Sequence, residues 1–132
     1  MDDIIRQILQ ETRTIAVVGL SDDPSRASHG VARYMQQHGY RIIPVNPKHT
    51  EILGEKCYPE LGAIPDKVDL VNVFRRSADC LRPAQDAVAI GARFLWLQLG
   101  IANEEARQVA EAGGLGVVMD RCIKIEHARI TE

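Results

Sequence analysis

The stretch TIAVVGLSDDPSRASHG, residues 14–30, decides the fold of this chain. Its first five residues are an apolar run that predicts a buried strand, Gly19 ends the run, and a polar loop leads to a helix for which Ser28 is the expected N-cap. A strand that runs into a helix N-terminus presents free backbone N–H groups and the positive end of a helix dipole, which together bind phosphate. The dinucleotide fingerprint G-x-G-x-x-G is incomplete, because its second and third glycines are absent after Gly19.

The length of 132 residues and the 45% content of hydrophobic residues predict a single domain, residues 1–132, with one hydrophobic core. A formal net charge of −2 and the lack of long runs of like charge argue against a nucleic-acid partner. The start of the chain is acidic and thinly apolar, which does not fit a signal peptide, and no stretch approaches the roughly 18 apolar residues of a membrane span. We therefore expect a soluble, cytoplasmic protein.

The cysteines favour a reducing compartment. Cys57, Cys80 and Cys122 are odd in number and far apart, and they form no C-x-x-C or histidine-bracketed pattern. Neither a disulfide framework nor a metal site is expected from such spacing.

The order of secondary structure follows from hydrophobic spacing. Residues 1–12 predict an amphipathic helix that packs on the core through Ile4, Ile5, Ile8 and Leu9. Five short runs predict strands, and most are apolar without strict alternation, as expected for a parallel sheet covered on both faces. These runs are TIAVV (14–18), YRIIPV (40–45), DLVNVF (69–74), RFLWLQL (93–99) and GVVM (116–119).

Helices are predicted between most of these strands. One runs from Ser28 to a C-terminal Gly39, one begins near Pro83 and ends by Gly91, and one is capped by Asn103. Residues 46–67 are rich in Pro and Gly and predict a loop-like crossover with a short extended piece at 55–58. The alternation indicates a Rossmann-like, doubly wound parallel sheet of five strands with helices on both faces.

If the five runs are numbered along the chain, we expect them to lie side by side in the sheet in the order 3-2-1-4-5. Gly19 then ends the central strand and lies close to a phosphate or to a helix backbone. Ligands of open parallel sheets bind beyond the carboxyl ends of the strands. Cations follow several of the predicted strands, which indicates a polyanionic ligand at that edge; they are Arg26, Lys48, Arg75, Arg76 and Arg121.

The end of the second strand bears on the kind of nucleotide. An NAD site usually has an acidic residue there for the ribose hydroxyl, whereas this chain has Asn46, Pro47 and Lys48. An ammonium at this position favours a phosphate on the adenosine ribose, as in coenzyme A or NADP. In the first loop, Ser21, Arg26 and Ser28 offer donors to a pyrophosphate, and the alternative is that the two serines only cap turns.

The combination of YRIIPVNP, ILGEKCYPEL, VNVFRRS and MDRCIKIEH resembles the small bacterial CoA-binding proteins, single Rossmann-like domains similar to the CoA-binding domain of the succinyl-CoA ligase alpha subunit. The resemblance covers about Thr14 to His127 and implies binding of coenzyme A or an acyl-CoA. The family often has Ala where Leu20 stands here. The phosphorylated histidine and ATP-grasp domains of the larger acyl-CoA ligases have no counterpart in this sequence.

The resemblance also implies roles for individual residues. The loop from Gly19 to Ser28 would hold the pyrophosphate, with Ser21 and Arg26 as polar contacts. Asn46, Pro47 and Lys48 would line the 3′-phosphate end, and Phe74, Arg75 and Arg76 would flank the nucleotide.

No catalytic constellation is visible in the sequence. The four histidines lack a metal-ligand or triad spacing, and Cys122 is either a thiol beside a bound CoA or a spectator. The leading hypothesis is a CoA-binding carrier, sensor or regulatory module that acts with a protein partner or as a homodimer. An NADP- or NAD-linked redox sensor or oxidoreductase fragment is the second hypothesis, and a protein-interaction domain with a vestigial pocket is the third.

Overall fold

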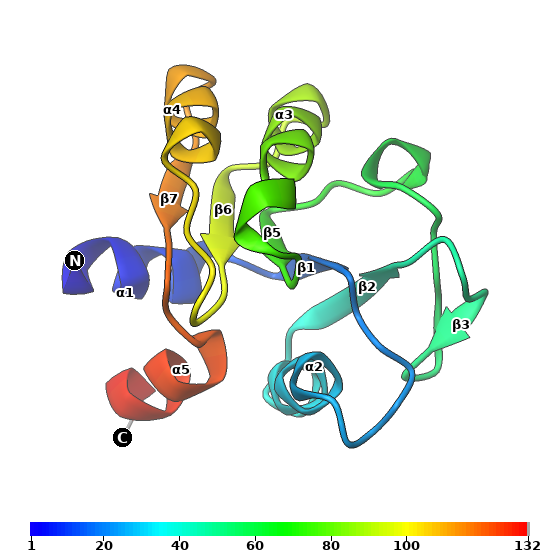
Figure 1. Ribbon diagram of the computed structural model, residues 1–132. Helices are drawn as coiled ribbons and strands as arrows, with labels where there is room; N and C mark the ends of the chain where they lie inside the picture. Colours follow the sequence, from blue (N-terminus) through cyan, green and yellow to red (C-terminus); the bar gives the residue numbers. More distant parts are fainter. Residues whose placement is uncertain (132) are drawn as a thin grey trace.

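Five parallel strands form the central sheet of the computed structural model, which describes residues 1–131. Every neighbouring pair in this sheet is parallel, and the spatial order is β2-β1-β5-β6-β7 (Figure 1). A separate two-stranded sheet pairs β3 with β4. The main strands are β1 (Thr14–Val18), β2 (Arg41–Val45), β5 (Leu70–Val73), β6 (Phe94–Leu97) and β7 (Gly116–Val118). The predicted α/β class and all five strands are therefore confirmed.

The predicted strand order is wrong. Numbered along the chain, the five strands lie in the order 2-1-3-4-5, so β5 is central and β1 lies between β2 and β5. Gly19 therefore follows the second strand from the edge and does not end the central one. The apolar runs predict strands but not their neighbours, because the path of the 46–69 crossover over β1 is decided by tertiary packing.

Helices cover both faces of the sheet, as expected. On one face lie α1 (Asp2–Glu11), α2 (Ala27–Gln37) and α5 (Ile123–Thr131), and on the other lie α3 (Leu81–Ala89) and α4 (Glu104–Ala112) (Figure 1). Each face has its own apolar cluster of strand and helix residues. Ile5 and Ile8 of α1 are fully buried, so the first helix packs on the core as predicted.

The helix ends follow the sequence signals with one exception. Asn103 caps α4 by accepting a hydrogen bond from the Ala106 N–H at 2.9 Å, and Gly39 follows α2 with a φ of +93°. Ser28 is not the N-cap of α2. The cap position is held by Arg26, two residues earlier, and the Ser28 hydroxyl accepts a hydrogen bond from the preceding loop instead.

The 46–67 crossover is not wholly irregular. It contains the hairpin of β3 (Glu51–Ile52) and β4 (Glu55–Lys56) and the 3-10 turn η1 (Leu61–Ala63). The predicted extended piece is confirmed at β4. A second 3-10 turn, η2 (Ser77–Asp79), precedes α3.

The C-terminal helix α5 is absent from the sequence-based expectations. Its carboxylate Glu126 is 6% exposed and accepts a hydrogen bond from Arg129, and Arg121 lies 3.6 Å away from it. The Trp96 indole N–H donates to the Arg121 carbonyl, which fixes the start of this helix over β6. No helix among residues 1–131 is long and apolar enough to cross a membrane.

Candidate functional site

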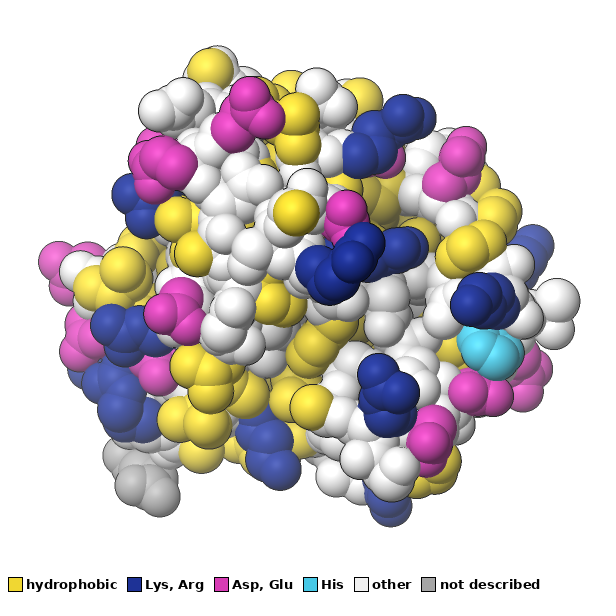
Figure 2. Space-filling view, viewed as in Figure 1, with side chains coloured by type: hydrophobic (Ala, Val, Ile, Leu, Met, Phe, Trp, Pro, Cys, Tyr) yellow, Lys and Arg dark blue, Asp and Glu magenta, His cyan; other side chains and the backbone are white. Residues whose placement is uncertain are grey.

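A hollow of about 250 Å³ lies at the carboxyl ends of β1, β2 and β5. Here the chain leaves β1 toward β2 through α2 on one face, whereas the connections through α3 and α4 cover the other face. Such a switch point is where open parallel sheets bind ligands. Figure 2 shows several Lys and Arg side chains, in dark blue, on this face of the molecule. Six of the ten predicted site residues line the hollow: Gly19, Asn46, Pro47, Lys48, Phe74 and Arg75.

Gly19 allows the ends of β1 and β5 to come together. Its φ is +83°, and a Cβ at this position would lie 2.4 Å from the Phe74 carbonyl oxygen. The Gly19 N–H donates to Val45, and the Phe74 N–H donates to Val18, so backbone pairing continues past the ends of the strands. The close approach expected of Gly19 is therefore made, but to the end of β5 and not to a helix.

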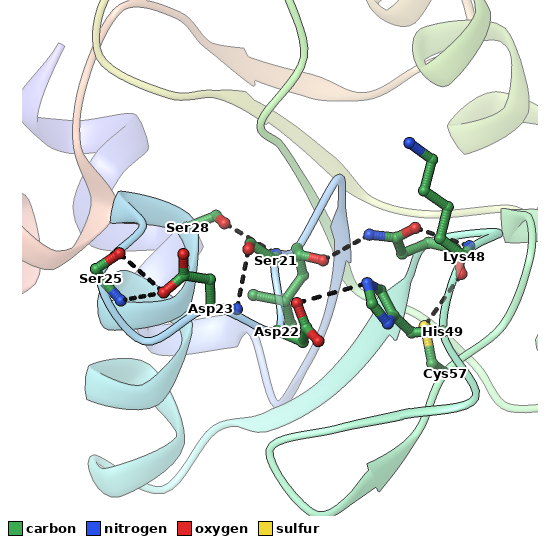
Figure 3. A network of polar contacts seen from close by, with 10 residues as sticks. Ser21, Asp22, Asp23, Ser25, Ser28, Lys48, His49 and Cys57 are labelled. Carbon is green, nitrogen blue, oxygen red and sulfur yellow. Dashed lines mark hydrogen bonds and ion pairs between the residues drawn. The ribbon is translucent and has the colours of Figure 1, made fainter.

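Asn46 joins two of the loops around the hollow. Its Nδ2 donates to the Leu20 carbonyl at 2.9 Å, and its Oδ1 accepts from the Lys48 N–H at 2.9 Å. The side chain thus positions the β1 loop and the Lys48 backbone. The Lys48 side chain is exposed, makes no ion pair within residues 1–131, and extends away from this network (Figure 3).

The two loop serines are engaged in the loop itself. The Ser28 Oγ accepts from the Ser21 N–H at 3.0 Å, and the Ser21 Oγ accepts from the Asp23 N–H at 3.0 Å (Figure 3). Hydrogen bonds from Ser25 hold the pKa of Asp23 below its ordinary value. Both serines therefore cap turns of the loop, and each hydroxyl hydrogen is still free to be donated.

Two further features flank the same loop. Arg26 is exposed at the N-cap of α2, and no side chain caps the first N–H groups of this helix. His49 Nε2 lies 3.6 Å from Asp22 Oδ1, a contact that becomes an ion pair when the imidazole is protonated. The loop that follows Gly19 of the hollow therefore leads to a helix N-terminus that no side chain caps.

Two of the predicted cations lie elsewhere. The Arg76 side chain is 86% exposed, pairs with Asp79 at 2.9 Å and does not line the hollow. Arg121 lies against Glu126 of α5. Of the five cations expected at one edge, Lys48 and Arg75 line the hollow, and Arg26 is the N-cap residue of α2.

The three cysteines are free thiols, and two of them are buried. Residues 1–131 contain no group of three metal-ligating side chains. Cys57 and Cys80 are buried, and burial raises the pKa of both thiols. Cys122 is half-buried and free.

A second hollow, of about 190 Å³, adjoins the first and shares Arg75 with it. No sequence motif marks it, because its walls come from residues far apart in the chain, among them the 59–61 segment and α3. Its lining residues are Val18, Val45, Pro59, Glu60, Leu61, Arg75, Asp79, Arg82, Pro83 and Asp86.

Comparison with known proteins shows the family of this chain. The CoA binding domain family matches residues 13–128. The chain belongs to this family of CoA-binding domains. It is 48% identical over 124 residues to the uncharacterized protein YneT of Bacillus subtilis (strain 168), covering 94% of this chain and 92% of YneT.

Two other similarities indicate the range of the family. A hypothetical protein from Pyrococcus horikoshii OT3 superposes with a TM-score of 0.96 at 39% identity, covering 100% of this chain and 93% of that one. The ADP-forming acetate–CoA ligase I of Archaeoglobus fulgidus is 28% identical over an alignment of 130 positions that covers 89% of this chain and 19% of the ligase. The CoA-binding domain thus occurs both as a small protein and as about a fifth of a ligase.

Proposed function

We propose that the chain binds coenzyme A or an acyl-CoA at the carboxyl edge of its sheet, through the pyrophosphate and the 3′-phosphoadenosine. The observation that carries the proposal is the hollow between β1, β2 and β5, in a chain of the CoA-binding domain family. In this proposal the pyrophosphate lies at the Ser21–Ser28 loop and the N-terminus of α2. The 3′-phosphate lies at Asn46, Pro47 and Lys48.

Local charge supports an anionic ligand. Lys48 and Arg75 line the hollow and no carboxylate does, although the whole chain has a net charge of −2. Arg26 is a third cation, at the N-cap of α2. Charge-assisted hydrogen bonds from such groups are the strong ones in phosphate recognition.

The proposed role is that of a carrier, sensor or regulatory module in the cytoplasm, without catalytic machinery of its own and acting with a protein partner or as a homodimer. The lining of the hollow supports binding, because it supplies cations, an amide and an aromatic ring. The acetate–CoA ligases among its relatives use a similar domain as a minor part of a much longer chain.

A thermal-shift and calorimetry panel with CoA, acetyl-CoA, dephospho-CoA, NADP and NAD tests the proposal. CoA at about 100 times its dissociation constant should stabilise the folded chain by roughly 2.7 kcal/mol, which is several degrees for a domain of this size. Dephospho-CoA and NAD should give much smaller shifts at equal concentration. A clear shift with NADP or NAD and none with CoA would favour the redox-sensor hypothesis instead.

A further inference from the structure

The order of the strands gives a bound CoA a direction along the carboxyl edge of the sheet. In the proposed function the 3′-phosphate lies at Lys48 after β2, and the pyrophosphate lies at the loop after β1. The strands lie in the order β2-β1-β5-β6-β7, so the pantetheine arm leaves the pyrophosphate on the side away from β2, toward the ends of β5, β6 and β7. The inference below rests on the proposed function through this step.

The last two strands of the sheet lie within reach of this arm. The pantetheine chain has about as many bonds as four residues of extended backbone, so it spans roughly 13–14 Å. Neighbouring strands are about 4.8 Å apart, which places the end of β6 about 10 Å and the end of β7 about 14 Å from the end of β1. The sulfur of the ligand therefore lies at the ends of β6 and β7.

An apolar patch lies at the same place. Among residues 1–131 three large hydrophobic side chains are exposed, and two of them follow β6 and β7: Leu99 is 63% and Ile125 is 55% exposed. The half-buried Cys122 lies directly before α5, and we call Leu99, Cys122 and Ile125 the apolar patch. Figure 2 shows hydrophobic side chains, in yellow, gathered over the start of α5 and the β6–α4 loop, which are seen in Figure 1.

Hydrogen bonds hold the two segments of the patch together. The Ile123 N–H donates to Gln98 Oε1 at 3.1 Å, and the Gly100 N–H donates to Asp120 Oδ1 at 2.7 Å. The Asp120 N–H donates in turn to the Ile101 carbonyl. Single exposed apolar side chains are common, but two from separate segments that are tied together at a candidate ligand edge indicate a binding surface.

We propose that the apolar patch binds the hydrocarbon chain of an acyl-CoA, so that the preferred ligand is a thioester with an acyl group of several carbons and not free CoA. A free thiol at this place leaves Leu99 and Ile125 in contact with water, whereas an acyl chain covers them. Each methylene that is half covered improves binding about twofold, so a hexanoyl group, which is four carbons longer than acetyl, improves it about tenfold.

Calorimetry with CoA, acetyl-CoA and hexanoyl-CoA tests the inference. The unmodified chain should bind hexanoyl-CoA about tenfold more tightly than acetyl-CoA. The double variant Leu99→Ser/Ile125→Ser should reduce this preference to about twofold, mostly through weaker binding of hexanoyl-CoA. Both side chains are exposed, so the substitutions leave the core intact.

Ile90→Ser is the matched control. Ile90 is the half-buried C-cap residue of α3, and the chain runs on from it to the start of β6, at the opposite edge of the sheet. The variant removes the same kind of side chain from a place that the ligand does not reach. Its preference for hexanoyl-CoA over acetyl-CoA should equal that of the unmodified chain.

The outcomes separate this inference from the proposed function. If hexanoyl-CoA binds within about twofold of acetyl-CoA, or if the double variant and Ile90→Ser behave alike, the acyl subsite is wrong and CoA binding stands. A dimer in sedimentation that dissociates in the double variant would assign the patch to a second copy of the chain and would also overturn the inference. If the unmodified chain binds neither CoA nor its thioesters, the proposed function itself is wrong.

Discussion

At the scale of single residues, Lys48 is the side chain that best distinguishes a phosphorylated ribose from an unphosphorylated one. Its backbone is held by the Asn46 side chain at 2.9 Å, while its ammonium is free of ion pairs within residues 1–131. Lys48→Ala should weaken CoA binding by about 5- to 30-fold, the lower part of the range for hydrogen bonds to charged groups, because the site is exposed to solvent. Calorimetry in low salt measures this change.

Dephospho-CoA lacks the 3′-phosphate and completes a double-mutant cycle with Lys48→Ala. Its binding should be weak already and should change little on mutation. Lys67→Ala, an exposed lysine that lines neither hollow, is the control for loss of charge. Equal losses for CoA and dephospho-CoA in Lys48→Ala would mean that the residue supports its loop and does not contact the 3′-phosphate.

Gly19 is a residue where backbone geometry excludes every side chain. Its φ is +83°, and a Cβ would lie 2.4 Å from the Phe74 carbonyl oxygen, a backbone atom that cannot move away cheaply. Gly19→Ala should lower the free energy of unfolding by about 2–4 kcal/mol, from left-handed strain together with overpacking. Urea unfolding measures this loss.

Gly30→Ala is the matched substitution for this prediction. Gly30 lies inside α2, and a Cβ there meets nothing within 4 Å. Alanine is the better helix former, so this variant should gain about 0.5–1 kcal/mol of stability. A loss of the same size in both variants would contradict the geometric account of Gly19.

At the scale of elements, α2 and α5 meet through a titratable cluster. The Tyr34 hydroxyl of α2 lies 2.9 Å from His127 Nδ1 of α5, and His38 and Tyr40 pack against the same imidazole. Lys124 of α5 lies over the Tyr34 ring. Burial, and then the neighbouring His38, hold the pKa of His127 below its ordinary value of 6.5.

This lowered pKa makes the packing of α5 sensitive to acid. The unfolded chain takes up the His127 proton near its ordinary pKa, whereas the folded chain takes it up only at lower pH. The contribution to stability is therefore complete above about pH 6.5 and is lost as the pH falls from there toward the pKa of the folded state. Urea unfolding from pH 8 to pH 5 measures this loss.

His127→Asn is the variant that tests the cluster, because the amide oxygen can still accept a hydrogen bond from Tyr34 but does not titrate. It should lose less stability than the unmodified chain between pH 7 and pH 5. His29 lies in the first turn of α2, outside the cluster, so His29→Asn should show the same pH dependence of stability as the unmodified chain. Identical pH profiles for His127→Asn and the unmodified chain would assign the acid sensitivity to other groups.

At the scale of the whole molecule, both helix layers share one sheet, so the chain should unfold as a single unit. Trp96, the only tryptophan, is fully buried in β6 and contacts the start of α5 through the Arg121 carbonyl. Its fluorescence and the helical circular dichroism signal should therefore change at the same urea concentration.

Ile8→Val in α1 extends this test to the first helix. Ile8 is fully buried, and the substitution should cost about 0.5–1.5 kcal/mol. Both midpoints should shift together by the same amount. A helix signal that is lost before the tryptophan signal would mean that residues 1–12 are a separate folding unit.

The sequence by itself determined the five strands of the main sheet, most of the helices between them and part of the composition of the ligand edge. Apolar runs located all five strands, and Asn103 and Gly39 marked helix ends, because these signals act within a few residues. The carboxyl ends of parallel strands meet at one edge, which brought Gly19, Lys48 and Arg75 into one predicted site. The structure lines one hollow with these three residues.

Only the tertiary structure decided which strands are neighbours and which polar groups are free. The order β2-β1-β5 depends on the path of a long crossover, which no local pattern encodes. Ser28 accepts a hydrogen bond from the Ser21 N–H and Asn46 donates one to the Leu20 carbonyl, contacts that no sequence pattern shows, and Arg76 pairs with Asp79 outside the hollow. The apolar patch was overlooked because its side chains come from segments distant in the chain, and the contacts between them exist only once the sheet has formed.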